Sequence, residues 1–294
     1  MFRFKFLLFV VITLAIFSPI LADAKWSLTP RIYVEGLYDD NIFLTERNEQ
    51  DDFITRVSPG VNLNYETPSG KVDLDYEFRR SFYNDFSELD YSAHHARAEA
   101  RMDFVSWFGA GINEVFIRDE DPIELVEITE FESPSIRTGE RDRYTRNIAT
   151  PWATVRFGDD RSIRIEYRNH ILRNDREDIA DQDENAGNAT FIFRFNIHNG
   201  IEIFYEHIDL EYSETVPLSD DIDHDGDEIR GRYTYYFNPR TSAFVEYRYW
   251  HRDFESESFF YFDYEVHNPT LGFTWDLYQN VTLSARGGYT VRNA

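Results

Sequence analysis

The fold of this chain is decided by the stretch Ala189-Thr190-Phe191-Ile192-Phe193-Arg194-Phe195-Asn196-Ile197-His198-Asn199-Gly200-Ile201-Glu202-Ile203-Phe204-Tyr205-Glu206. Apolar side chains occupy alternate positions before and after the centre, which is the two-residue period of β-strands with two unlike faces. His198, Asn199 and Gly200 predict a tight turn, because Asn and Gly accept the positive φ angles that such turns use. A hairpin that is aromatic on one face and charged on the other suits a sheet between hydrocarbon and water.

The same alternation repeats along the chain. Strands are expected at about 27–38, 53–65, 72–82, 96–104, 108–118, 144–157, 162–172, 233–237, 243–249, 262–275 and 281–292, in addition to the hairpin 189–212. Long connections alternate with short turns such as 67–70 and 158–160, as in barrels with long outer loops and short periplasmic turns. The pattern predicts an all-β fold, an antiparallel up-and-down transmembrane β-barrel with about 13 visible strands.

The number of strands bears on the end of the chain. Bacterial single-chain barrels have an even number of strands, so that both ends lie in the periplasm. Thirteen strands would leave the chain on the outer side after Arg292-Asn293-Ala294. We therefore expect at least one further strand and a barrel that is incomplete at its C-terminus.

The N-terminus has the features of an export signal. Two basic residues precede the apolar run 6–17, and Ala22-Asp23-Ala24 has the small-x-small pattern of a signal peptidase site. Residues 1–24 are therefore a predicted signal peptide and residues 25–294 the barrel domain. A membrane anchor is the alternative, but the apolar run is shorter than the roughly 20 residues that span a bilayer.

Composition excludes several functions. The net charge is -24, whereas nucleic-acid binders need basic surfaces, so no nucleic-acid partner is expected. The chain has no Cys, which excludes disulfides, thiolate metal sites and cysteine catalysis. Beyond the N-terminus no long apolar run suggests a membrane-spanning helix.

The negative charge is concentrated in the expected outer loops. The segments 39–52, 119–142, 174–187 and 211–228 contain 29 acidic and 4 basic residues, which leaves the rest of the mature chain neutral. Charges on the strands are expected to face a lumen, where they must pair or stay hydrated. The candidate lumen-lining residues are Asp75, Glu77, Arg97, Glu99, Arg101, Arg164, Glu166, Arg168, Arg194, Glu202, Glu206, Arg232, Glu246, Arg248 and Arg252. Their arginines either select anionic solutes or pair structurally with the carboxylates.

One outer loop resembles part of a calcium site. Asp221, Asp223, Asp225 and Gly226 match the start of a calcium-binding loop, in which alternating carboxylates converge on a hard cation. The twelfth position is Arg232 rather than Glu, so a solvated acidic loop is the favoured reading and no cofactor is expected. Weak Ca²⁺ binding at this loop is the alternative, and such loops could bridge through cations to lipopolysaccharide.

His94 and His95, near Ser92 and Asp90, raise the possibility of a surface hydrolase. Adjacent strand residues point to opposite faces, so at most one of the two histidines could serve. No G-x-S-x-G or H-E-x-x-H motif is present. Polar rim residues are the simpler reading, and we expect no catalytic residue and no enzymatic activity.

Three segments carry a family resemblance. Leu37-Tyr38-Asp39-Asp40-Asn41-Ile42-Phe43, followed by Asp51-Asp52-Phe53-Ile54-Thr55 and Ser58-Pro59-Gly60-Val61, resembles the N-terminal region of outer-membrane β-barrel porin families. These include barrels associated with exopolysaccharide export and PEP-CTERM/exosortase systems of Gram-negative bacteria. The resemblance implies an outer-membrane barrel whose partners are membrane lipid and lipopolysaccharide, together with a polysaccharide or export machinery. It supplies no catalytic residues.

Three functions therefore remain open from the sequence. The first is a porin-like barrel that passes solutes or assists polysaccharide export. The second is a non-conducting structural or adhesive barrel whose acidic outer loops bind cations. The third, an envelope-modifying enzyme, has the least support in the sequence.

Overall fold

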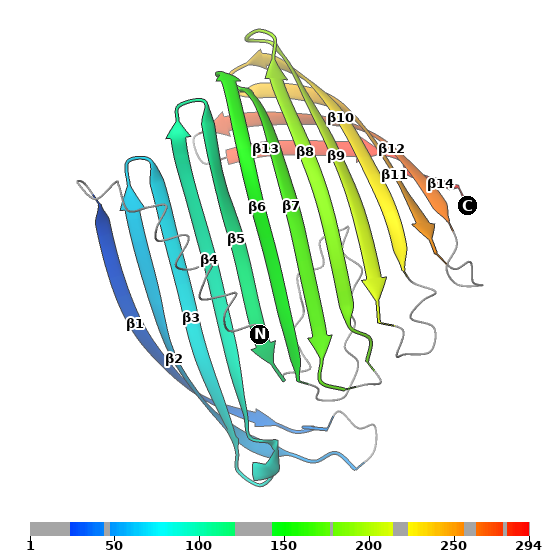
Figure 1. Cartoon of the computed structure of the whole chain (residues 1–294). Coiled ribbons are helices and arrows are strands. Elements are labelled where there is room, and N and C mark those ends of the chain that lie inside the picture. The colour runs from blue at the N-terminus through cyan, green and yellow to red at the C-terminus, as the bar shows by residue number, and fades with distance from the viewer. Residues whose placement is uncertain are drawn as a thin grey trace.

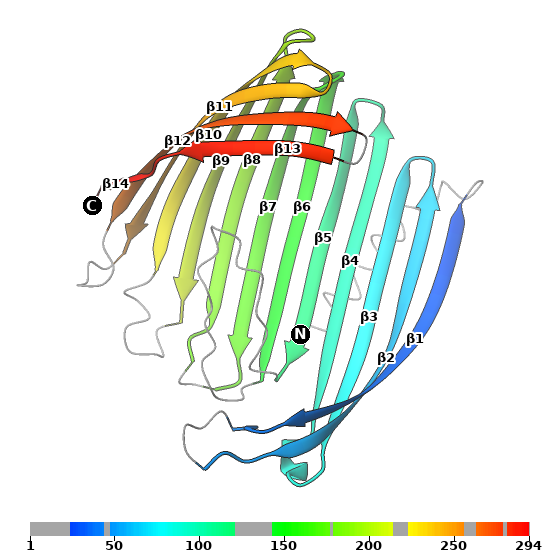
Figure 2. The same ribbon diagram turned by 180° about the vertical axis from the view of Figure 1, so that it is seen from behind.

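A computed structural model describes residues 24–43, 48–120, 143–176, 179–213, 223–255, 263–278 and 281–293. Of the predicted signal peptide only Ala24 is among them. Nearly all of these residues belong to one curved antiparallel sheet, with short turns at one end and long connections at the other (Figures 1 and 2). No helix in these ranges has the length and apolarity that crossing a membrane requires.

The strands follow one another in chain order across the sheet. They are β1 (Lys25–Asp39), β2 (Asp52–Thr67), β3 (Gly70–Tyr83), β4 (Tyr91–Val105), β5 (Phe108–Asp119), β6 (Tyr144–Gly158), β7 (Arg161–Asn174), β8 (Gln182–Arg194), β9 (Asn199–Tyr212), β10 (His224–Asn238), β11 (Thr241–Phe254), β12 (Tyr264–Tyr278), β13 (Val281–Gly288) and β14 (Val291–Asn293), with a short 3₁₀ helix at Ser87–Leu89. Both β13 and β14 pair with β12, so the predicted last strand is one row interrupted at Tyr289 and Thr290. The up-and-down architecture predicted from the sequence is confirmed.

The sheet is open in the described part of the chain. There β1 pairs only with β2 and β13 only with β12. Because β1 and β13 are both odd-numbered, they run in the same direction, from the short-turn end to the long-connection end (Figure 1).

The two faces of the sheet differ as the alternation predicts. Ile165 is 56% exposed and Val245 48% exposed on the outer face, whereas Glu246 on the inner face is 2% exposed. Inner-face side chains also meet across an intervening strand, as Arg286 of β13 does with Glu246 of β11. Such contacts identify the charged face as the concave one. The apolar face is the convex one, which would contact lipid in a barrel.

The turn of the 189–212 hairpin lies earlier than predicted. It comprises residues 195–198, since β8 ends at Arg194 and β9 begins at Asn199. The Asn196 side-chain oxygen accepts hydrogen bonds from the backbone N–H groups of His198 (2.8 Å) and Asn199 (3.0 Å). Neither Asn199 nor Gly200 has a positive φ. The predicted cause was therefore wrong, because a side-chain hydrogen bond shapes this turn.

Several strands extend further into the acidic segments than predicted. Asp52 opens β2, Asp119 closes β5, and Glu184 and Glu228 lie within β8 and β10. All four were assigned to outer loops from their acidic surroundings, and all four are buried on the inner face. The acidic connections are thus shorter than expected, and part of their charge belongs to the barrel wall.

A small apolar core occupies the long-connection end of the first strands. It is formed by Ile42, Ile54, Tyr83, Tyr91 and Ala93. Beside it, the carboxylate of Asp52 accepts hydrogen bonds from backbone N–H groups of the β3–β4 connection, at 3.1–3.2 Å. Asp52 therefore anchors this connection to β2.

Hydrogen-bonded tyrosines mark one boundary of the outer apolar belt. Each lies on the outer face and bonds to a polar side chain nearer the long connections. The pairs are Tyr76–His94 (2.8 Å), Tyr167–Asn185 (2.6 Å), Tyr205–Asp227 (2.7 Å) and Tyr247–His267 (2.6 Å). Tyrosines with an apolar body and a hydrated hydroxyl are typical of a membrane interface.

The register shows that these tyrosines follow a regular stagger. Ile171 of β7 is in register with Tyr76, so Tyr167 lies four residues nearer the short turns, four strands away from β3. Tyr205 of β9 lies two residues nearer the short turns than the position in register with Tyr167, and Tyr247 of β11 lies two residues nearer the short turns than the position in register with Tyr205. A stagger of one residue per strand, with a rise of ~3.3 Å per residue and a strand spacing of ~4.8 Å, corresponds to a strand tilt of about 35° from the barrel axis. This tilt is within the range of transmembrane barrels and brings the tyrosines to one height.

Candidate functional site

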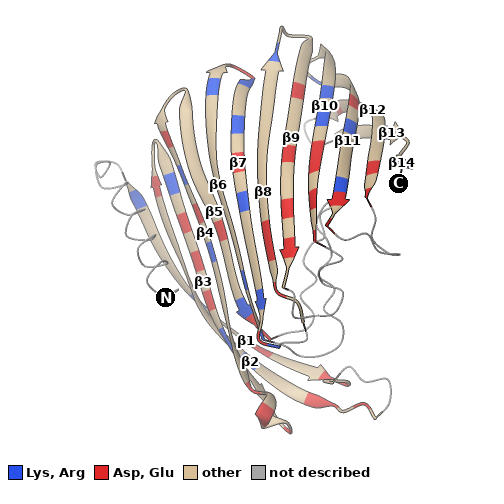
Figure 3. Cartoon of the chain, turned by 45° about the vertical axis from the view of Figure 1, so that its right-hand side comes forward, with Lys and Arg blue, Asp and Glu red and all other residues tan. Residues whose placement is uncertain are grey.

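The concave face is the candidate functional site. The register places all of the predicted lumen-lining residues on it, between positions that point outward. Acidic and basic positions are distributed over most strands, with β9 acidic and β7 mainly basic (Figure 3). The face is therefore a mosaic of opposite charges rather than a surface of one sign.

On β1 to β5 the charges form a continuous cluster. Arg31 binds Asp75 at 2.5 Å and approaches Glu77 at 3.6 Å. Arg79 lies 3.5 Å from Glu77 and 3.7 Å from Asp119. Because Arg31 and Arg79 both approach Glu77, the cluster joins β1, β3 and β5.

On β7 and β8 the inner pairs are similar. Arg164 binds Glu166 at 2.8 Å, and Arg168 binds Glu184 at 2.7 Å, with His170 at 3.8 Å from the same carboxylate. The Glu184 side chain is only 5% exposed. A carboxylate buried to this extent needs its cationic partners, since an unpaired buried charge is costly.

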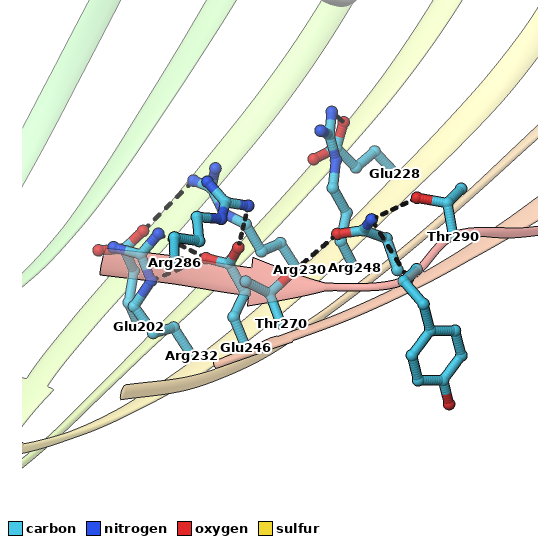
Figure 4. A network of polar contacts seen from close by, with 11 residues as sticks. Glu202, Glu228, Arg230, Arg232, Glu246, Arg248, Thr270, Arg286 and Thr290 are labelled. Carbon is cyan, nitrogen blue, oxygen red and sulfur yellow. Dashed lines mark hydrogen bonds and ion pairs between the residues drawn. The ribbon is translucent and has the colours of Figure 1, made fainter. Parts of the chain in front are cut away.

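The most extensive polar network joins β9 to β13 (Figure 4). Glu246 accepts from Arg232 (Nε, 2.7 Å) and from Arg286 (3.0 Å), although its side chain is 1% exposed. Arg248 binds Glu228 at 2.7 Å, and both side chains are at most 10% exposed. Each buried carboxylate in this network is thus matched by guanidinium groups.

Many inner-face arginines also lie over an aromatic ring. The pairs are Arg164–Trp152 (4.2 Å), Arg194–Tyr236 (4.4 Å), Arg232–Phe244 (4.6 Å), Arg248–Trp250 (4.7 Å) and Arg230–Phe204 (4.9 Å), measured from the guanidinium carbon to the ring centroid. Every one of these arginines also has a carboxylate partner. A ring on one side and a carboxylate at the edge fix the guanidinium plane, which a lysine could not reproduce.

The inner face of β4 differs from this pattern. Arg97 and Arg101 are exposed, and neither forms an ion pair with another described residue. Arg101 is in register with Gly111 of β5, where a Cβ atom would lie 2.6 Å from the Trp152 ring. The missing side chain at Gly111 admits Trp152, and the arginines of β4 stay open to solvent.

Four other predicted positions lie on the inner face with different partners. Glu99 of β4 and Glu206 of β9 are in register with Asp73 and Glu228, respectively, so like charges are neighbours there. Arg252 donates to the carbonyl oxygen of His251 at 3.1 Å. Arg194 binds Asp160 of the β6–β7 turn at 2.8 Å, near the short-turn end.

The suspected hydrolase group is not assembled. His95 points inward and is hydrogen-bonded to Asp119 at 2.7 Å, whereas His94 points outward to Tyr76. Ser92, on the same outer face as His94, accepts a hydrogen bond from Arg80 at 3.1 Å. The predicted division of the two histidines between opposite faces is confirmed, and Ser92 cannot act with His95.

The suspected cation loop is only partly described, because Asp221 lies outside the described residues. Asp223 accepts a hydrogen bond from the backbone N–H of Tyr212 at 2.7 Å, and Asp225 lies within β10, opposite Asp209 and Asp253. The described residues contain no group of three or more metal-ligating side chains. Ca²⁺ binding at this loop stays a prediction.

Sequence reasoning missed several members of the inner network, among them Arg31, Arg79, Asp119, Glu184, Glu228, Arg230 and Arg286. Glu184 and Glu228 continue the inward alternation that ends at Arg194 and Arg232, so the two-residue period was the available signal. It was obscured by the neighbouring acidic residues, which resemble a loop.

Comparison with known proteins supports the same class. Residues 24–119 match the sequence profile of the family described as "Putative beta-barrel porin 2". The matched segment spans β1 to β5, about a third of the chain, and contains all three stretches that carry the resemblance. No curated protein matches the chain.

Several solved outer-membrane proteins are weakly similar to the chain in structure. A loop L8 deletion mutant of OmpT from Vibrio cholerae is 12% identical, with 90% of this chain and 99% of that chain covered and a TM-score of 0.43. OpdQ of Pseudomonas aeruginosa is 11% identical over 93% and 95%, with a TM-score of 0.38. A mutant of the TodX monoaromatic hydrocarbon channel is 12% identical over 90% and 82%, also with a TM-score of 0.38. No functional inference follows from similarities of this size.

The fold, the apolar outer belt and the family match define a class. The chain is an outer-membrane β-barrel protein whose first five strands are similar to a porin family, and its location is the bacterial outer membrane. The family resemblance predicted from the sequence is confirmed over residues 24–119.

Proposed function

We propose that the chain forms the wall of a channel for polar solutes, polysaccharide among them, and that it has no catalytic role. The observation that carries this proposal is the hydrophilic character of the inner face from β1 to β13. Buried apolar side chains on that face lie toward the long-connection end, in the cluster around Tyr83 and Tyr91 and at Tyr144, Leu172, Ala186, Ile208, Leu210 and Val266. An inner surface of fixed and mutually compensated charges suits hydrated solutes.

A second candidate is a non-conducting structural or adhesive barrel. It is favoured by the buried pairs Arg232–Glu246 and Arg248–Glu228, which direct side chains toward each other rather than toward solvent. In this case the acidic outer connections would bind cations or lipopolysaccharide. The two candidates differ in whether water and ions cross the wall.

Single-channel recording separates them. We expect the purified protein, reconstituted in planar lipid bilayers, to show steady openings whose conductance scales with salt concentration. Bilayers that stay silent while the protein is demonstrably inserted, for example by protease protection in matched vesicles, would support the non-conducting barrel instead.

The cation interaction requires its own measurement. If the acidic connections bind Ca²⁺, addition of the ion should raise the thermal stability and slow hydrogen exchange at residues flanking Asp223. An unchanged melting temperature and unchanged exchange across a Ca²⁺ titration would contradict this part of the proposal.

A further inference from the structure

An open depression of about 550 Å³ lies on the inner face between β11 and the β13–β14 row. We call it the Trp250 pocket. It is lined by Arg248, Trp250, Asn268, Thr270, Arg286, Gly287, Gly288 and Thr290. Its volume is within the roughly 300–1,000 Å³ of small-molecule sites, which combine an aromatic surface with a few fixed polar groups.

The exposed charge of the pocket is positive. Arg286 uses one nitrogen for Glu246 at 3.0 Å, yet 57% of its side chain is exposed. Glu246 itself is 1% exposed and also held by Arg232, so it offers no negative surface to a ligand. The remaining N–H groups of Arg286 are therefore available to an acceptor, and a carboxylate is the acceptor that fits the guanidinium fork best.

The neutral polar groups of the pocket are arranged in a row. Asn268 donates to the Thr290 hydroxyl at 2.7 Å and accepts from the Thr270 hydroxyl at 3.0 Å (Figure 4). The Thr290 hydroxyl keeps its own donor for a further hydrogen bond, whereas Thr270 is only 4% exposed and serves to hold Asn268. Asn268 and Thr290 therefore present polar groups to a ligand with hydroxyl groups around its edge.

Trp250 supplies the apolar wall. The guanidinium of Arg248 lies 4.7 Å from the ring centroid and is also tied to Glu228, so the arrangement of indole and guanidinium is fixed. A sugar ring is complementary to this surface, because one of its faces carries C–H groups that can pack on the indole and its rim carries hydroxyls. A carboxylate on the sugar would also bind the guanidinium of Arg286.

We propose that the Trp250 pocket binds a unit of an acidic saccharide, a hexuronate, with its carboxylate on Arg286, its ring beside Trp250 and its hydroxyls on Asn268 and Thr290. The inference rests on the proposed function, since it names a solute class for the same inner face. The sequence of the long connections is strongly acidic, which opposes entry of an anionic polymer from that end.

Binding in detergent tests the pocket without requiring conduction. Isothermal titration of the full chain with a uronate oligosaccharide, at low ionic strength, should show saturable binding, and a neutral oligosaccharide of equal length should bind at least tenfold more weakly. Arg286→Gln should weaken uronate binding at least tenfold, and Arg286→Lys should weaken it less because the charge remains. Arg80→Gln, which removes an arginine stacked on Phe82 on the outer face of β3, is the matched control and should bind as the parent does.

The outcomes are distinct. Absent uronate binding, equal binding of the neutral sugar, or equal losses in Arg286→Gln and Arg80→Gln would each overturn the pocket assignment. Circular dichroism of each variant establishes that it is folded, and Arg286→Lys preserves the ion pair with Glu246 if Arg286→Gln does not fold. Steady conductance without uronate binding would refute the pocket alone, whereas uronate binding without conductance would refute the channel and leave the site.

Discussion

Arg31 reaches Asp75 across an entire strand, with its two terminal nitrogens 2.5 Å and 2.6 Å from the two carboxylate oxygens. The intervening residue on β2 is Gly60, which is in register with both Arg31 and Glu77. A Cβ atom there would lie 3.0 Å from Arg31 Nε and 3.0 Å from the carbonyl oxygen of Tyr76. The absent side chain at Gly60 thus lets a charge on β1 pair with one on β3.

Filling this position should be costly. We expect Gly60→Leu to lower the free energy of unfolding by about 1–3 kcal/mol, because the side chain must displace Arg31 and press on the backbone. Urea titration of protein folded into phospholipid vesicles measures it. Gly231→Leu is the matched control, since an added Cβ at outward-facing Gly231 meets nothing within 4 Å. Equal losses of stability in both variants would contradict the inference that Gly60 makes room for the Arg31–Asp75 ion pair across β2.

Glu246 should be the most sensitive carboxylate of the β9–β13 network. Glu246→Gln removes the charge shared by Arg232 and Arg286 at a site that is 1% exposed, so we expect a loss of roughly 3 kcal/mol. Glu202→Gln provides the comparison, because the Arg230–Glu202 pair is 30% exposed on both sides and should be worth less than about 1 kcal/mol. The same urea titration would disprove the ranking if Glu202→Gln were the more damaging change.

The tyrosine boundary predicts how the outer face tolerates charge. Ile165 and Asn169 both point outward on β7, on either side of Tyr167. Ile165→Arg places a charge inside the apolar belt and should cost about 2–4 kcal/mol, whereas Asn169→Arg, beyond the boundary, should cost less than about 1 kcal/mol. Unfolding measurements in vesicles of one lipid composition test this. Similar costs at the two positions would show that the boundary is misplaced.

The exposed arginines of β4 should set ion preference. The double substitution Arg97→Gln and Arg101→Gln removes two positive charges that have no ion-pair partner among the described residues, so the permeability ratio should shift toward cations. Reversal potentials across a salt gradient measure the ratio. The pair Arg164→Gln and Glu166→Gln leaves the net charge unchanged and should leave the ratio near that of the parent. A larger shift in that pair than in the β4 variant would exclude β4 as the determinant.

For nearly every strand, the sequence predicts which side chains point outward and which point inward, because a strand between lipid and water must alternate apolar and polar side chains. Val72, Leu74 and Tyr76 lie outward and Asp73, Asp75 and Glu77 inward, as predicted. The ends of the strands were harder to predict from the sequence. At Glu184 and Glu228 the local acidity resembled a loop, although each has a cationic partner on a neighbouring strand.

The pairing of the inner charges lay beyond the sequence for a different reason. Which arginine meets which carboxylate depends on register and curvature, and contacts such as Arg31–Asp75 and Arg286–Glu246 skip a strand. The hairpin turn at 195–198 was misplaced because Phe195 and Ile197 continue the apolar alternation past the end of β8. Alternation defines facing and cannot by itself define where a strand stops.

The one-residue stagger of the tyrosines also constrains how such a wall can change in length during evolution. Adding or deleting one residue within a strand exchanges its water-facing and lipid-facing side chains. Adding or deleting two residues preserves the two faces and only shifts the register of the strand against its neighbours. Insertions inside the wall should therefore survive in even numbers, and odd ones should accumulate in the connections, where parity has no meaning.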